Sequence, residues 1–198
     1  MTISARDSIL GSIRRHLPEA AERPGHDGPW IQYPDPLSQF ASVLEAIGGR
    51  CVRVKDVAEI NQDLATFPVY AAARMMVSLV PGAGRSVREM ANVADPHELA
   101  DVDLAILPGD FAVAENAAVW VTDAAVKHRV IYFLSQHLAL VVSAGQVVHN
   151  LHEAYARLTF DAARFGAFIA GPSKTADIEQ SLVIGAHGPR SMTVYLME

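Results

Sequence analysis

Residues 171–179, Gly-Pro-Ser-Lys-Thr-Ala-Asp-Ile-Glu, bring together glycine, hydroxyl and amine groups in a pattern suited to holding an anion. The segment follows an apolar run that we expect to be a strand and precedes an expected helix. In an open α/β sheet ligands lie beyond the carboxyl ends of the strands, and a helix N-terminus offers free N–H groups to an anion. Gly171, Ser173, Lys174 and Thr175 are therefore candidates for binding a phosphate or a carboxylate.

Asp177 and Glu179 belong to the same segment and join the ligand-binding candidates. The segment also has a structural interpretation. Ser173 or Thr175 can cap the expected helix, the two carboxylates can offset its dipole, and Lys174 can be solvated. The sequence leaves both interpretations open.

A second segment, Gly185-Ala186-His187-Gly188-Pro189, places a histidine between two turn glycines. Because an imidazole titrates near neutral pH, His187 is a candidate general acid or base. The alternative is that its ring ties the loop to the backbone by hydrogen bonds. Gly185 and Gly188 complete the set of candidate binding residues.

Three further motifs are explained better by a structural role of their residues than by a catalytic or binding role. The loop 81–87 contains Gly-Ala-Gly, but Val87 stands where a dinucleotide-binding fingerprint has its third glycine. His149 and His152 precede a glutamate in the order His-x-x-His-Glu, which is not the zincin order, so we expect no metal site. Cys51 lies in an expected strand and is read as a small buried apolar residue.

Composition indicates one globular domain. Of the 198 residues 51% are hydrophobic and 19% are charged, the reverse of a disordered chain. The formal net charge is −6, whereas proteins that bind nucleic acid usually carry an excess of basic side chains. We therefore expect no nucleic-acid partner.

The single cysteine excludes an internal disulfide and an iron–sulfur cluster in this chain, and no cofactor is evident. No apolar run approaches the roughly 20 residues that cross a bilayer, and the N-terminus carries charge where a signal peptide would be apolar. These features predict a cytoplasmic protein without a membrane segment.

The N-terminal region is expected to form an arm. Ile9, Leu10, Ile13 and Leu17 recur at helical spacing, and Ser4 can cap a helix over residues 4–17. A proline- and glycine-rich connection follows, so we divide the chain into an arm at 1–36 and one domain at 37–198. The arm helix can pack across the body or on a partner subunit, which makes a homo-oligomer possible.

The domain alternates helices and strands. Expected helices cover 37–47, 56–65, a short piece from Asp95, 146–163 and 175–184, and expected strands cover 50–54, 75–80, 104–107, 117–121, 130–134, 138–142, 166–170 and 192–197. Such alternation predicts a three-layer α/β sandwich whose mostly parallel sheet has helices on both faces. The consecutive strands between 104 and 142 suggest an antiparallel insertion or a mixed edge.

The motifs GPSKTADIE and GAHGP, with Ala114-Glu115-Asn116 and the HLALVV run at 137–142, resemble the LUD-domain family, which includes the lactate utilization protein C group. The resemblance is strong over 103–198, and the opening SARDSILGSIR is also similar to the family's first helix. It implies a Rossmann-like fold of the sugar-isomerase and coenzyme A-transferase type (NagB/RpiA/CoA-transferase-like).

The resemblance also implies a role in oxidising L-lactate to pyruvate beside partner proteins that carry iron–sulfur clusters. The family usually has Ala-Glu-Thr-Gly-Thr in the turn, whereas Asn116-Ala117-Ala118 follows Glu115 here, and Ser135 replaces a common proline.

Two hypotheses follow. The first is an accessory or regulatory subunit of a lactate-oxidising complex. The second is a stand-alone enzyme or binding protein for a small anionic or phosphate-containing ligand, with Glu115 or His187 as the acid or base and Asn116 beside the ligand.

Overall fold

The computed structural model describes residues 4–18, 28–158, 165–175 and 183–198. Its helices are α1 Ala5–Arg15, α2 Pro36–Ala46, α3 Val57–Thr66, α4 Pro68–Ala72, α5 Ile131–Leu134 and α6 Leu151–Arg157, with 3-10 turns η1 Met90–Asn92, η2 Pro96–Leu99 and η3 Ala144–Gln146. Its strands are β1 Arg50–Val54, β2 Met76–Ser78, β3 Leu104–Pro108, β4 Phe111–Val113, β5 Ala118–Thr122, β6 His137–Ser143, β7 Val147–Val148, β8 Gly166–Ile169, β9 Lys174–Thr175, β10 Val183–Ile184 and β11 Ser191–Met197.

Short polar side chains begin several helices where the sequence predicts them. Ser4 accepts a hydrogen bond from the backbone N–H of Asp7 at the start of α1, and Asp56 does the same for Glu59 in α3. Asp95 and Glu98 form a complete capping box on η2, and α2 is followed by Gly48 at φ 89°. Left-handed backbone of this kind is tolerated best by glycine.

The central sheet has five strands in the order β1-β11-β6-β3-β2, and every neighbouring pair is parallel. A second sheet of four strands, in the order β7-β4-β5-β8, contains the antiparallel pairs β4–β5 and β5–β8. The predicted parallel sheet and antiparallel insertion are thereby confirmed, with the insertion forming a separate sheet.

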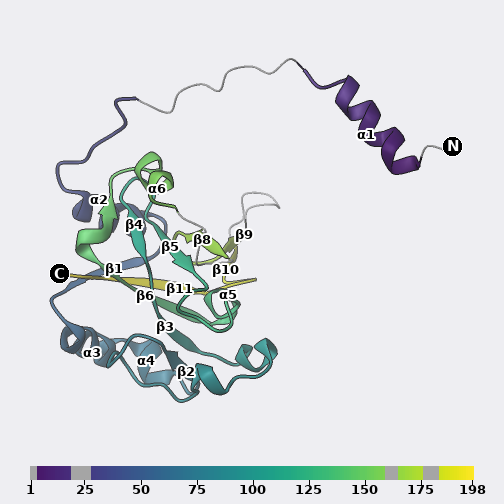
Figure 1. The fold of residues 1–198 in the computed structure, drawn as a ribbon. Coiled ribbons are helices and arrows are strands. Elements are labelled where there is room, and N and C mark those ends of the chain that lie inside the picture. Colours follow the sequence, from purple (N-terminus) through teal and green to yellow (C-terminus); the bar gives the residue numbers. More distant parts are fainter. Residues whose placement is uncertain (1–3, 19–27, 159–164, 176–182) are drawn as a thin grey trace.

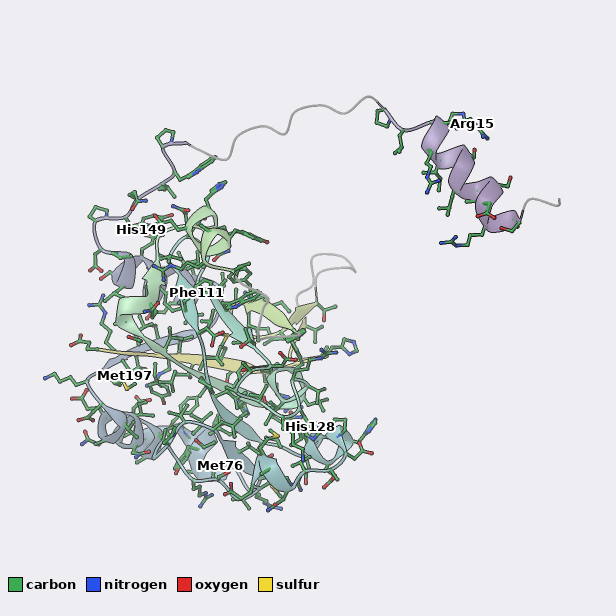
Figure 2. The ribbon with its side chains drawn as sticks, viewed as in Figure 1. Arg15, Met76, Phe111, His128, His149 and Met197 are labelled. Atoms are coloured by element: carbon green, nitrogen blue, oxygen red, sulfur yellow. The ribbon has the colours of Figure 1, made fainter. Side chains whose placement is uncertain are left out.

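Helices lie on both faces of the central sheet as expected, but on one face a helix shares the cover with the second sheet (Figure 1). One face packs against α3 through Ile60 and Leu64. The other face packs against α2 and against the inner face of the second sheet. The outer face of that second sheet is covered by α6, and Trp120 and Ala154 belong to one buried cluster there. Met76 and Phe111 mark the clusters under α3 and under α6 (Figure 2).

Three expected elements differ. Where a strand is expected at 130–134, Ile131–Leu134 form the short helix α5, because a five-residue apolar run does not distinguish a buried strand from a buried helix. The helix expected at 146–163 begins only at Leu151, after β7, and residues 159–163 lie outside the described residues. The helix expected at 175–184 is wrong at both ends, where β9 and β10 pair antiparallel; residues 176–182 are not described.

Helix α1 stands apart from the body of the protein (Figure 1), and none of its residues is buried. Ile9 and Ile13 are 59% and 53% exposed. None of the helices in the described ranges combines the length and apolar character needed to cross a bilayer.

Candidate functional site

The two C-terminal motifs are joined by backbone hydrogen bonds. The N–H of Ser173 donates to the carbonyl of Pro189, and the N–H of Gly185 donates to the carbonyl of Ser173, both at 2.9 Å. A Cβ placed on Gly188 would lie 3.0 Å from the Cβ of Ser173. The structure therefore brings Ser173, Gly185 and Gly188 together.

Gly171 turns the chain at the end of β8. Its φ is 70°, and a Cβ there would lie 3.0 Å from a side-chain carbon of Ile47, the residue that ends α2. Both the backbone conformation and the close packing favour glycine. Gly171 therefore shapes the turn that leads to Ser173.

The helix N-terminus expected to hold an anion is absent at residues 174–175. Lys174 and Thr175 form β9, and the N–H of Ser173 is already bonded to Pro189. The preceding strand β8 belongs to the second sheet, so the rule for carboxyl ends of parallel strands does not apply to it. Ligand binding by Ser173, Lys174 and Thr175 stays a prediction, and Asp177 and Glu179 lie outside the described residues.

His187 lies in the exposed loop between β10 and β11. Its imidazole makes no hydrogen bond with any residue that the structure describes. The alternative in which the ring ties the loop to the backbone therefore finds no support in these residues. The general acid or base role stays a prediction.

Glu115 and Asn116 form the turn between β4 and β5. The N–H of Glu115 donates to the carbonyl of His149 at 3.0 Å, and its carboxylate accepts from the N–H of Leu151 at 2.9 Å. The side-chain oxygen of Asn116 accepts from the N–H of Ala118 at 3.1 Å. These polar groups stabilise the turn and the first turn of α6.

Ala117 completes this turn with φ at 55°, in the left-handed region. Its side chain is fully buried in the core between the two sheets. The departure from the family pattern noted in the sequence therefore falls on a position whose backbone favours glycine. Here the position carries alanine, whose methyl group is buried, instead of the conformationally freer glycine.

The sequence did not indicate that residues 30–33 fasten onto the start of α6. The N–H of Tyr33 donates to Nδ1 of His149 at 3.0 Å, and the amide of Gln32 donates to Glu153 at 2.6 Å. The rings of Trp30 and His152 stack with centroids 3.5 Å apart. The His-x-x-His-Glu pattern was the only local signal, because its partners lie more than a hundred residues earlier.

The histidines of this group attach residues 30–33 to α6, since Nδ1 of His149 accepts a hydrogen bond from Tyr33 and the ring of His152 stacks on Trp30. No group of three or more histidine, cysteine or acidic side chains in the described ranges is arranged to hold a metal ion. Cys51 is half-buried in β1, and burial raises the pKa of its thiol to about 11. A thiol so weakly ionised at neutral pH is a poor nucleophile.

The glycine-rich loop after β2 is held by Asn61. The amide of Asn61 donates to the carbonyl of Gly82 at 2.9 Å, and its oxygen accepts from the N–H of Gly84 at 2.7 Å. The N–H of Gly84 is thus already bonded, which leaves it unable to hold a phosphate. This agrees with the interpretation of the segment as a surface loop.

Comparison with known proteins confirms the resemblance. Lactate utilization protein C 1 of Bacillus mycoides (strain KBAB4) is 32% identical over 94 residues, 44% of this chain and 40% of that protein. Lactate utilization protein C of Geobacillus kaustophilus (strain HTA426) is 34% identical over 101 residues, 48% of this chain and 41% of that protein. The matched segments thus span about two fifths of the length of these relatives.

A crystal structure of a DUF162 family protein from Deinococcus radiodurans shares the fold, with a TM-score of 0.64 and 19% identity over 85% of this chain and 99% of that one. The model of the LUD domain matches residues 84–197, which is more than half of the sequence and includes the β4–β5 turn and both C-terminal motifs. The chain belongs to the LUD domain family.

Proposed function

We propose that this protein is a component of a lactate utilization system, resembling lactate utilization protein C, and acts in the cytoplasm in the oxidation of L-lactate to pyruvate. The observation that carries the proposal is the LUD domain match over residues 84–197, together with relatives named lactate utilization protein C. Its role is accessory or regulatory, beside partner proteins that carry iron–sulfur clusters.

The side-chain chemistry supports an accessory role. Oxidation of lactate needs an acceptor for two electrons, and an iron–sulfur cluster is held by several cysteine thiolates. This chain has Cys51 alone. Glu115, the retained carboxylate of the family turn, is bonded to the start of α6. The electron carrier in this proposal therefore belongs to another chain.

Helix α1 supplies a surface for a second chain. Ile9 and Ile13 lie one turn apart on α1 and are 59% and 53% exposed, and Leu17, two residues beyond the helix, is 63% exposed. Burying such side chains stabilises an interface by about 1.5–3 kcal/mol each. We propose that these apolar side chains contact the cluster-bearing partner.

The test is purification of the full chain under gentle, oxygen-free conditions. We expect a co-purifying protein with the visible absorbance of an iron–sulfur cluster that L-lactate bleaches. The double variant Ile9→Ser and Ile13→Ser should lose this partner, whereas the control Ser8→Ala and Ser12→Ala should keep it. Recovery of the protein alone, or of a partner whose absorbance ignores lactate, contradicts the proposal.

The second candidate function is binding of a small anionic or phosphate-containing ligand by the C-terminal motifs. It is favoured by the exposed imidazole of His187, which lies in the loop that packs on Ser173. A ligand that binds only the folded protein raises its melting temperature. Carboxylates, nucleotides, coenzyme A and folates should be compared, and an upward shift that Lys174→Ala or His187→Ala abolishes supports this function. No shift with any of them contradicts it.

A further inference from the structure

A cleft of about 660 Å³ opens where β3, β6 and β11 begin. Its polar side consists of Asp101 and Asp103 before β3, Gln136 and His137 at β6, and Arg190 before β11. Its apolar lining comes from α4 and the residue that follows it. The cleft lies at the amino ends of the parallel strands and contains none of the candidate residues discussed above.

The two carboxylates of the cleft already have partners. Asp103 accepts from the backbone N–H groups of Arg74 and Met75 at 2.7 and 2.9 Å, and these bonds lower the pKa of its carboxyl. Asp101 accepts from both terminal nitrogens of Arg88 at 2.7 and 3.1 Å. The charge of Asp101 is therefore balanced by Arg88, and the carboxylate of Asp103 is satisfied by backbone hydrogen bonds.

The cation of the cleft has no such partner. The backbone N–H of Arg190 donates to the carbonyl of Gln136 at 2.7 Å, which fixes the residue at the cleft. Its guanidinium makes no ion pair or hydrogen bond with any described residue. A guanidinium presents paired donors that match the two oxygens of a carboxylate.

His137 adds a second group that can face a ligand. Its Nδ1 lies 2.7 Å from the hydroxyl of Ser191, whereas its Nε2 has no partner within the described ranges. Burial, and then the charge of Arg190, lower the pKa of the ring. The lowered pKa favours the neutral imidazole, which does not compete with Arg190 for a single anion.

We propose that this cleft binds a small carboxylate anion with a compact apolar tail, held by the guanidinium of Arg190. The tail lies against Pro68, Val69 and Ala72 of α4. The inference rests on the cleft alone and does not depend on the function proposed above.

Gly185 positions the arginine. A Cβ placed on Gly185 would lie 2.4 Å from Cγ of Arg190 and 3.0 Å from its Cα. Any larger residue therefore displaces Arg190, and the φ of 77° at Gly185 also favours glycine. The glycine of the second C-terminal motif thus acts through its neighbour in the cleft.

The test uses the full chain and sodium propionate at constant ionic strength and pH 7, with binding followed by calorimetry and by the NMR signal of the His137 ring. We expect Arg190→Gln to weaken propionate binding by about 10-fold to 100-fold, the effect of one charge-assisted hydrogen-bonding partner. The matched control Arg157→Gln removes an arginine of α6 outside the cleft and should bind propionate like the unaltered protein. Circular dichroism and melting temperature establish that both variants are folded.

Two further probes test separate parts of the proposal. Acetate lacks one methylene group and should bind about fourfold more weakly than propionate. Equal binding of acetate overturns the apolar contact. Binding of n-propylammonium that is tighter than binding of propionate overturns the choice of an anion, since it would assign recognition to the two aspartates. No binding of propionate up to about 10 mM, or equal affinity in Arg190→Gln, overturns the site itself.

Discussion

The carboxylate of Glu115 accepts a hydrogen bond from the backbone N–H of Leu151, 2.9 Å away, at the first residue of α6. The backbone N–H of Glu115 also donates to the carbonyl of His149. The turn between β4 and β5 is thereby fastened to the helix that covers the second sheet. A residue that looks catalytic in the sequence thus has a defined structural role.

Replacing Glu115 separates the structural role from a chemical one. Glu115→Ala removes the acceptor and the negative charge at a helix start, so we expect the free energy of unfolding to fall by about 1 kcal/mol in urea titrations. Glu115→Gln keeps an acceptor oxygen and should lose less. If both variants match the unaltered protein in stability, the hydrogen bond to Leu151 does not contribute as described.

Ala117 gives a second prediction. Its φ of 55° is strained for any residue with a Cβ, by roughly 1–2 kcal/mol. Ala117→Gly relieves that strain but loses a buried methyl group worth about 0.8 kcal/mol, so its stability should stay within about 1 kcal/mol of the unaltered protein. Ala117→Val adds volume to a full core and a branched Cβ, and should lose more than about 2 kcal/mol. Thermal unfolding of the pair checks this, and equal stability of both variants would contradict it.

Ser135 carries a buried hydroxyl that finds no acceptor or donor among the described residues, with 1% of the side chain exposed. Burying such a group without a partner costs about 1–3 kcal/mol. We expect Ser135→Ala to raise the free energy of unfolding by about 1 kcal/mol. The control Ser8→Ala, on the exposed helix α1, should leave it unchanged. A loss of stability in Ser135→Ala would show that the hydroxyl has a partner.

The ionisation of Asp63 makes the free energy of unfolding depend on pH in the acidic range. The guanidinium of Arg50 and the hydroxyl of Tyr195 donate to its carboxylate, and together they lower the pKa of Asp63 in spite of its burial. The folded pKa lies below the unfolded value of about 3.9, so this stabilisation is present above pH 4 and is lost as the pH falls through the folded pKa.

The variant Asp63→Asn tests this sign. Its deficit in unfolding free energy relative to the unaltered protein should be largest at pH 6–7 and should narrow as the pH falls below about 4. Urea titrations at several pH values measure it. A deficit that stays constant with pH would mean that the ionisation of Asp63 is not linked to folding.

Local signals predicted much of the fold. The strand at 50–54 and the helix starts at Ser4, Asp56 and Asp95 follow from capping side chains and short apolar runs, which act within a few residues. The strand predicted at 130–134 was wrong. The segment forms α5, which packs against η2, and the local sequence does not encode that contact.

The candidate site was predictable to a smaller extent. The two C-terminal motifs meet as a pair, yet the two ends of the helix expected at 175–184 pair as the strands β9 and β10. The attachment of Tyr33 to His149 and the cleft around Arg190 both join segments far apart in the chain. Such groupings emerge only once the sheet has formed.

Strand β11 lies between β1 and β6 in the central sheet, although β1 ends at residue 54 and β11 begins at residue 191. During synthesis on the ribosome β1 therefore emerges long before β11, the strand with which it pairs. Until β11 has been made, the apolar side chains of β1 stay exposed to solvent. Closing so long a loop slows folding and lengthens the time in which the chain can aggregate. From this strand order we expect refolding to be slow and to lose more protein to aggregation as the protein concentration rises.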